Sequence, residues 1–110
     1  MAVREVLEIG HPLLAKPADA VDPAAISSSE FQGRVDDMID TMRACNGAGI
    51  AANQIGINAR MFVVEVSADN PRYPFKPPID LTVLINPVIS PISEHTFENY
   101  EGCLSVPGLR

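Results

Sequence analysis

The sequence predicts an α+β fold in which short antiparallel strands pack on helices. One long amphipathic pattern over residues 27–45 indicates a helix, and three short segments rich in β-branched and aromatic residues indicate strands. These strands follow one another through loops and do not alternate with crossover helices, which favours antiparallel pairing. The chain has 110 residues, of which 46% are hydrophobic and 20% charged, so residues 1–110 are expected to form a single domain around one core.

The first 26 residues are expected to form an extended arm. Pro12, Pro17 and Pro23 prevent a long helix there, because proline removes a backbone donor and clashes with the preceding turn. One helical turn is expected between His11 and Ala15.

The long helix is expected to begin at Ser27, which has capping-box spacing to Glu30. Apolar side chains then recur at steps of three and four residues, and these are Phe31, Val35, Met38, Met42 and Cys45. The pattern places Cys45 in the core and puts the charged residues, Asp37 among them, on the other faces. The helix should end at Asn46-Gly47, a pair suited to a left-handed turn.

The predicted strands cover residues 60–66, 81–86 and 96–100. Four prolines fall between Pro71 and Pro78, which is too dense for a sheet, so this stretch is predicted to be a surface loop.

Charge and hydropathy exclude several classes of function. The chain has 8 Lys and Arg against 14 Asp and Glu, a formal charge of −6, which disfavours binding to DNA or RNA. The longest strictly apolar run is Met61 to Val64, so neither a secretory signal nor a membrane span is predicted, and a cytoplasmic location is expected. In that compartment Cys45 and Cys103 should be reduced thiols.

The segment GAGIAA at residues 47–52 matches the dinucleotide-binding pattern G-x-G-x-x-G/A. That pattern carries meaning only after a strand and before a helix, whereas here it follows the long helix. A helix cap and turn is the simplest interpretation, and the two glycines would also let another chain approach the backbone closely.

Cys103 is expected at the edge of a loop, next to glycine and shortly before Pro107-Gly108. From the residues alone it could serve in packing, as a metal ligand, or as a nucleophile activated by His95. His95 and His11 are interpreted as solvated or locally hydrogen-bonded side chains.

Two segments considered together resemble the first two signature motifs of the peptide deformylase family. They are GAGIAANQ at residues 47–54, similar to G-x-G-x-A-A-x-Q, and EGCLS at residues 101–105. The resemblance covers the whole chain and includes further short matches, which are Val6-Leu7, His11-Pro12, Ile85-Asn86-Pro87 and Arg110.

This resemblance implies a metal-dependent hydrolase that removes the formyl group from the N-terminal formylmethionine of nascent polypeptides. The implied cofactor is one divalent metal ion, usually iron, with zinc, nickel or cobalt able to occupy the site. Cys103 would be a thiolate ligand, and two histidines of a later His-Glu-x-x-His helix and a water would complete the coordination. The implied partners are N-formylmethionyl nascent peptides, and the resemblance allows transient association with the ribosome.

The resemblance also implies roles for the other motif residues. Gln54 and the backbone N–H of Leu104 would form an oxyanion hole for the formyl oxygen. The remaining positions are expected to border the substrate, and these are Gly47, Gly49, Ile50, Glu101, Gly102 and Arg110. For Glu101 and Arg110 the alternative is an ordinary surface ion pair.

One departure from the family pattern is large, because no His-Glu-x-x-His occurs in these 110 residues. Two metal ligands, the general base and the central metal-binding helix are therefore missing. We expect the chain to be the N-terminal portion of a longer deformylase domain and to be inactive by itself. The alternative is a non-catalytic fragment or remnant that retains the peptide-binding groove.

Overall fold

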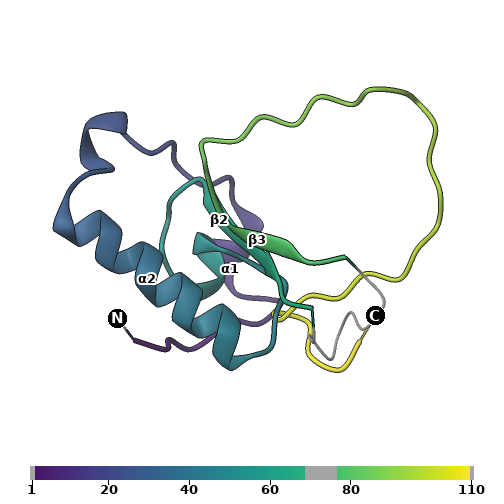
Figure 1. The fold of residues 1–110 in the computed structure, drawn as a ribbon, viewed down its shortest axis with the longest axis horizontal. Coiled ribbons are helices and arrows are strands. Elements are labelled where there is room, and N and C mark those ends of the chain that lie inside the picture. Colours follow the sequence, from purple (N-terminus) through teal and green to yellow (C-terminus); the bar gives the residue numbers. More distant parts are fainter. Residues whose placement is uncertain (1, 69–76, 110) are drawn as a thin grey trace.

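The computed structural model describes residues 2–68 and 77–109. Its elements in chain order are α1 (Pro12–Ala15), the 3-10 helix η1 (Pro23–Ala25), α2 (Ser29–Ala44), β1 (Gly49–Ala51), the 3-10 helix η2 (Ala52–Ile55), β2 (Met61–Val66) and β3 (Ile79–Ile85). The strands form one antiparallel sheet in the order β1-β2-β3, with α2 packed along it (Figure 1). The α+β prediction with antiparallel strands is confirmed. Within the described ranges, no helix is both long and apolar enough to cross a membrane.

The N-cap of helix α2 lies one residue later than the sequence pattern predicts. The N-cap is Ser28, not Ser27: its backbone is extended and its Oγ accepts the Phe31 N–H at 3.1 Å. This is the capping geometry that satisfies a free donor of the first turn. At the other end Asn46 adopts a left-handed φ of 54°, and the Gly47 N–H donates to the Met42 carbonyl at 2.9 Å, as a left-handed helix end requires.

The core lies between α2 and the sheet. Its buried apolar side chains are Val21, Phe31, Val35, Met38, Met42, Ile50, Ala52, Ile55, Ile57, Met61 and Val63. The prediction that Cys45 belongs to this core is wrong, because its thiol is exposed. The helix has already ended at Ala44, so Cys45 no longer follows the helical period that carries Met38 and Met42 inward.

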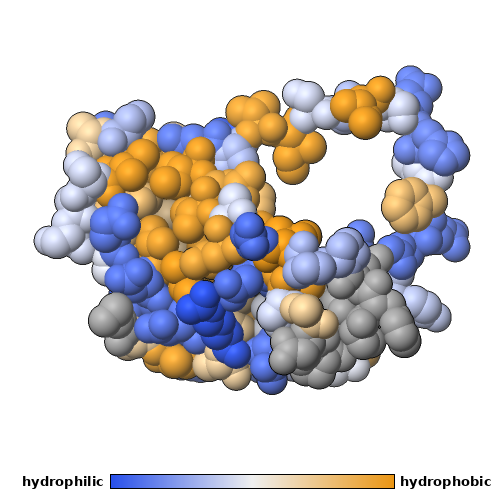
Figure 2. All heavy atoms as spheres, in the orientation of Figure 1, coloured by the Kyte–Doolittle hydropathy of each residue, from blue (hydrophilic) through white to orange (hydrophobic). Residues whose placement is uncertain are grey.

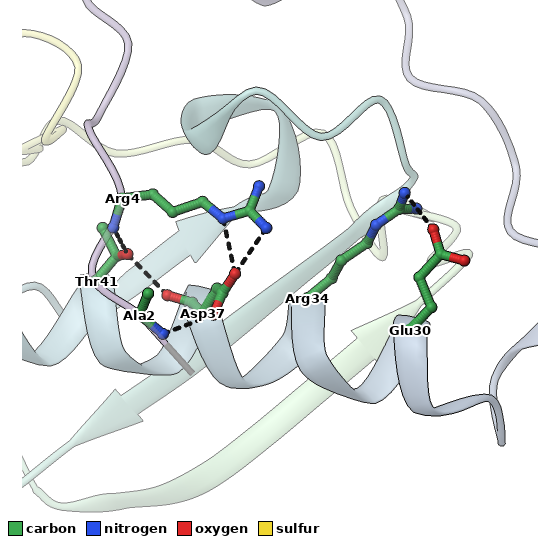
Figure 3. Close-up of polar contacts among 6 residues, drawn as sticks. All are labelled: Ala2, Arg4, Glu30, Arg34, Asp37 and Thr41. Atoms are coloured by element: carbon green, nitrogen blue, oxygen red, sulfur yellow. Dashed lines mark hydrogen bonds and ion pairs between the residues drawn. The ribbon is translucent and has the colours of Figure 1, made fainter.

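Asp37, which the sequence pattern assigns to a solvent face, is buried instead. The Arg4 Nε and the Ala2 backbone N–H each donate to its carboxylate at 2.7 Å (Figure 3). The next helical turn holds the same arm, because the Arg4 N–H donates to Thr41 Oγ1 at 2.8 Å. The N-terminal arm therefore lies along α2, and its polar partners offset the cost of burying a charge.

This carboxylate should make the stability of the fold depend on acid pH. Hydrogen bonds to the carboxylate, among them those from the Arg4 guanidinium and the Ala2 N–H, lower the pKa of Asp37 from its ordinary 3.8 to about 2. A lowered folded-state pKa stabilises the fold above pH 4, and this contribution is lost as the pH falls toward 2. We expect Asp37→Asn to lower the free energy of unfolding by roughly 2 kcal/mol at pH 7, as for other hydrogen bonds to a charged group.

Urea denaturation at several pH values checks this expectation. The difference between the unmodified chain and Asp37→Asn should shrink as the pH approaches 2, whereas Asp80→Asn, at an exposed position of β3, should have little effect at any pH. A difference that stays constant from pH 7 to pH 2 would contradict the assigned role.

Two of the three predicted strands form, and one unpredicted strand joins them. β2 and β3 correspond to the predicted segments 60–66 and 81–86, while β1 lies in the glycine-rich segment and pairs Ile50 with Val63. The predicted strand at residues 96–100 is absent. Residues 71–76 of the proline-rich stretch lie outside the described residues, whereas Pro77 and Pro78 are exposed and have no regular secondary structure.

The segment after β3 runs as a wide loop away from the sheet (Figure 1), and apolar side chains lie along it (Figure 2). Phe97 and Tyr100 keep 80% and 83% of their surface exposed. Their β-forming side chains predicted a strand, but a strand also needs a neighbour for its backbone groups, and no described strand borders this segment.

Asn86 fixes the second half of the N-terminal arm against the sheet. Its side chain accepts the Val21 N–H at 2.7 Å and donates to the Val21 carbonyl at 2.8 Å, which imitates a strand pair. The predicted extended arm and its helical turn are confirmed, with the turn observed as α1.

Candidate functional site

The two motif segments are brought together by the N-terminal arm. The Leu7 N–H donates to the Gln54 carbonyl at 2.7 Å, and the Ile9 N–H donates to the Ser105 carbonyl at 2.9 Å. Residues two apart in an extended chain present their N–H groups to the same side. One edge of residues 7–9 therefore holds both motifs, which are far apart in the sequence.

A pocket opens where the motifs meet. It holds about 360 Å³ of empty space, part of it open to solvent, and is lined by residues 47–49, Gln54 and residues 102–104. A shallower hollow on the other side of Cys103 is lined by Glu101, Gly102, Cys103, Val106 and Leu109. The structure thus gathers most of the residues that the sequence singles out.

Two expected site residues are placed differently from the prediction, and a third lies outside the described residues. The Ile50 side chain is only 2% exposed and belongs to the core, so only its backbone is left to border a ligand. Glu101 is exposed beside the shallower hollow, away from the pocket. Arg110 lies outside the described residues, and so does any ion pair that it makes.

The side-chain amide of Gln54 is held by three contacts. Its Oε1 accepts the Ala51 N–H at 2.9 Å, while its Nε2 donates to Ser105 Oγ at 3.0 Å and lies 3.6 Å from Cys103 Sγ. A backbone N–H can only donate, so the first contact determines which end of the amide is oxygen. The amide nitrogen must therefore face the sulfur across the pocket.

Gly47 packs closely against Leu104 in the site. A Cβ atom added there would lie 2.9 Å from Leu104 Cδ1, nearer than side chains approach one another. The glycine lets Leu104 fill this space and pack against the core. In residues 2–68 and 77–109 no hydrogen bond engages the Leu104 N–H, so this donor is available to a ligand.

An ion pair lies next to the glycine segment, residues 47–49. The Ala48 carbonyl accepts the Glu65 N–H at 2.9 Å, and the Glu65 carboxylate makes two bonds of 2.9 Å to the Arg43 guanidinium. The hydrogen bonds from Arg43 lower the pKa of Glu65 below its ordinary value. This bidentate pair joins the end of α2 to β2, beside the pocket.

Strand β1 is an edge of the sheet. It pairs with β2 on one side, and no other described strand pairs with it. An unpaired edge beside a pocket can accept an extended peptide as an added strand.

Cys103 offers an exposed free thiol at the edge of a turn, which the Val106 N–H closes by donating to the Cys103 carbonyl at 3.0 Å. The described part of the chain contains no group of three His, Cys, Asp or Glu able to hold a metal. His11 is used locally, since its Nδ1 accepts the Leu13 N–H, and the His95 side chain is exposed. The thiol suits a divalent transition metal, but these residues supply one ligand and not a complete site.

The sequence model of the family described as polypeptide deformylase matches residues 3–110. The chain belongs to the peptide deformylase family. Peptide deformylases are metal-dependent hydrolases, and the motifs that line the pocket are those by which the sequence resembles them.

The similarity to individual deformylases extends along the whole chain. The chain is 42% identical over 110 residues to a peptide deformylase of Leptospira biflexa and 46% identical to peptide deformylase 1 of Prochlorococcus marinus. It covers 62% and 56% of these two proteins, so it spans about three fifths of the length of such relatives.

Solved deformylase structures share the fold. A class I type b peptide deformylase from Acinetobacter baumannii superposes with a TM-score of 0.89 at 36% identity, covering 97% of this chain and 67% of that one. Its Met-Ala-Ser-bound form gives a TM-score of 0.87 at 34% identity, with coverage of 97% and 68%.

The structure adds Ala48 and Ser105 to the residues predicted for the site. Ala48 lines the pocket between the two glycines, and Ser105 is only 4% exposed, with its hydroxyl on Gln54. The sequence signal that could have identified both residues is their place in the two motifs. Neither alanine nor serine suggests a role in the site by its residue type alone.

Proposed function

We propose that the full-length protein, of which this chain is the N-terminal portion, removes the formyl group from the N-terminal formylmethionine of nascent polypeptides. The observation that carries this proposal is the Gln54 amide nitrogen, held 3.6 Å from the Cys103 sulfur in a pocket built from both motifs. The substrates would be met in the cytoplasm, with transient association with the ribosome.

In this proposal Cys103 is a thiolate ligand of one divalent ion, iron in the first place, with zinc, nickel or cobalt as alternatives. The remaining ligands, two histidines, and the general base would come from the part of the relatives' length that this chain does not cover. When bound, the metal supplies Lewis-acid chemistry and a water of lowered pKa.

The described residues would bind and orient the substrate. The Gln54 Nε2–H and the Leu104 N–H donate to the formyl oxygen and stabilise the negative charge that develops on it. The free edge of β1, which begins at Gly49, pairs with the backbone of the substrate. The relative from A. baumannii that binds Met-Ala-Ser supports a peptide in such a site.

The second candidate is a non-catalytic protein that keeps the peptide groove. Among the described residues Cys103 is the single expected metal ligand, which favours this function for the 110-residue chain by itself. We expect that chain to be inactive. Binding of peptides without hydrolysis would distinguish it from an enzyme.

Release of formate from formyl-Met-Ala-Ser tests the proposal. The full-length protein, loaded with Fe²⁺ without oxygen, is expected to release formate, whereas acetyl-Met-Ala-Ser should give no acetate and serves as the control. Residues 1–110 alone should release none. Full-length protein that carries one metal ion and binds the peptide, yet releases no formate, would establish the non-catalytic alternative.

A further inference from the structure

We propose that Ser105 is a positioning residue, which holds one hydrogen of the Gln54 amide so that the other points into the pocket. This inference rests on the deformylase function proposed above and deepens it. Ser105 is 4% exposed, and its Oγ accepts from Gln54 Nε2 at 3.0 Å.

The orientation of a glutamine amide has to be imposed from outside. The last torsion of glutamine joins an sp³ to an sp² atom and is broad, so it has no strong preference of its own. In this site the Ala51 N–H holds Oε1 at 2.9 Å, and Ser105 holds one side of Nε2. Because the amide is planar, these two contacts determine the direction of its second N–H bond. That bond points toward Cys103 Sγ.

The arm keeps the two partners at a constant separation. Leu7 and Ile9 bind the carbonyls of Gln54 and Ser105, so the backbones that carry the amide and the hydroxyl are held by one extended segment. Because Ser105 is buried, water competes weakly for its hydroxyl, and the bond to Nε2 is stronger than it would be at the surface. Without the hydroxyl, both hydrogens of the amide could turn toward solvent or the sulfur.

Ser105→Ala in the full-length protein is therefore expected to lower kcat about tenfold, with KM and metal content nearly unchanged, since only an interaction in the transition state is misaligned. Ser105→Thr keeps the hydroxyl and should retain most of kcat. Ser93→Ala, the same change at an exposed position of the loop, is the matched control and should have no effect.

A double-mutant cycle separates positioning from a structural role. In a Gln54→Ala background, Ser105→Ala should cause no further loss of kcat, because the group that it positions is gone. If the two losses instead multiply, Ser105 acts independently of Gln54 and the inference is overturned.

A measurement without substrate keeps the inference distinct from the proposed function. The side-chain NH₂ signals of Gln54 are assigned by their disappearance in Gln54→Ala, and the signal of the proton that faces Ser105 should move in Ser105→Ala. Unchanged signals would overturn the inference even if formate is released. Absence of formate release with the expected spectral change would overturn the function and leave the positioning role supported.

Discussion

Replacing Gln54 with alanine in the full-length protein is expected to lower kcat roughly a hundredfold, as removal of other oxyanion donors does. The amide nitrogen of Gln54 lies 3.6 Å from the Cys103 sulfur. This nitrogen can donate a hydrogen bond but cannot ligate a cation. The variant should therefore keep its metal, and the loss should appear in kcat more than in KM.

Gln32→Ala is the matched control for this experiment. Gln32 is exposed, and its amide caps the Ile26 carbonyl at 2.7 Å, outside the pocket. Steady-state formate release, with metal content measured on the same samples, decides the outcome. Near-full activity of Gln54→Ala, or a loss of metal from it, would show that its assigned role is wrong.

Replacing Cys103 with alanine should have the largest effect of all, because it removes a metal ligand. We expect the variant to lose its bound metal and, with it, measurable formate release. The thiol itself offers a second test in the unmodified protein. While metal is bound, Cys103 should resist alkylation, and it should react once a chelator has removed the ion.

Cys45 is the internal reference for the labelling experiment. On the sequence pattern it would be buried and unreactive, but the structure exposes it, so it should react with and without metal. Mass spectrometry of the two labelled peptides measures both rates at once. Cys103 labelling that is the same before and after chelation would contradict its role as a metal ligand.

Much of the fold was predictable because its signals are local. The apolar spacing of Phe31, Met38 and Met42 depends on neighbours within two turns, and the structure buries all three. The strands β2 and β3 follow from runs of β-branched residues in the same way. The short strand β1 was missed, since its three residues include a glycine and an alanine and form a strand only against β2.

The candidate site was predictable only through its two motifs. Composition and spacing left Cys103 open between packing, metal binding and nucleophilic chemistry. The resemblance to deformylases selected among these, and the family match over residues 3–110 confirms the membership. The pocket between Gln54 and Cys103 is consistent with the roles that the resemblance implies, which remain proposals.

The sequence by itself determined the membership in the family, the class of fold and the periodic core, because these depend on the order and spacing of residues along the chain. Only the tertiary structure decided the burial of Asp37, the exposure of Cys45 and the partnership of Ser105 with Gln54. Each of these depends on what another part of the chain places beside the residue. The Leu7 and Ile9 backbone donors join two motifs far apart in sequence, and no local pattern encodes such a contact.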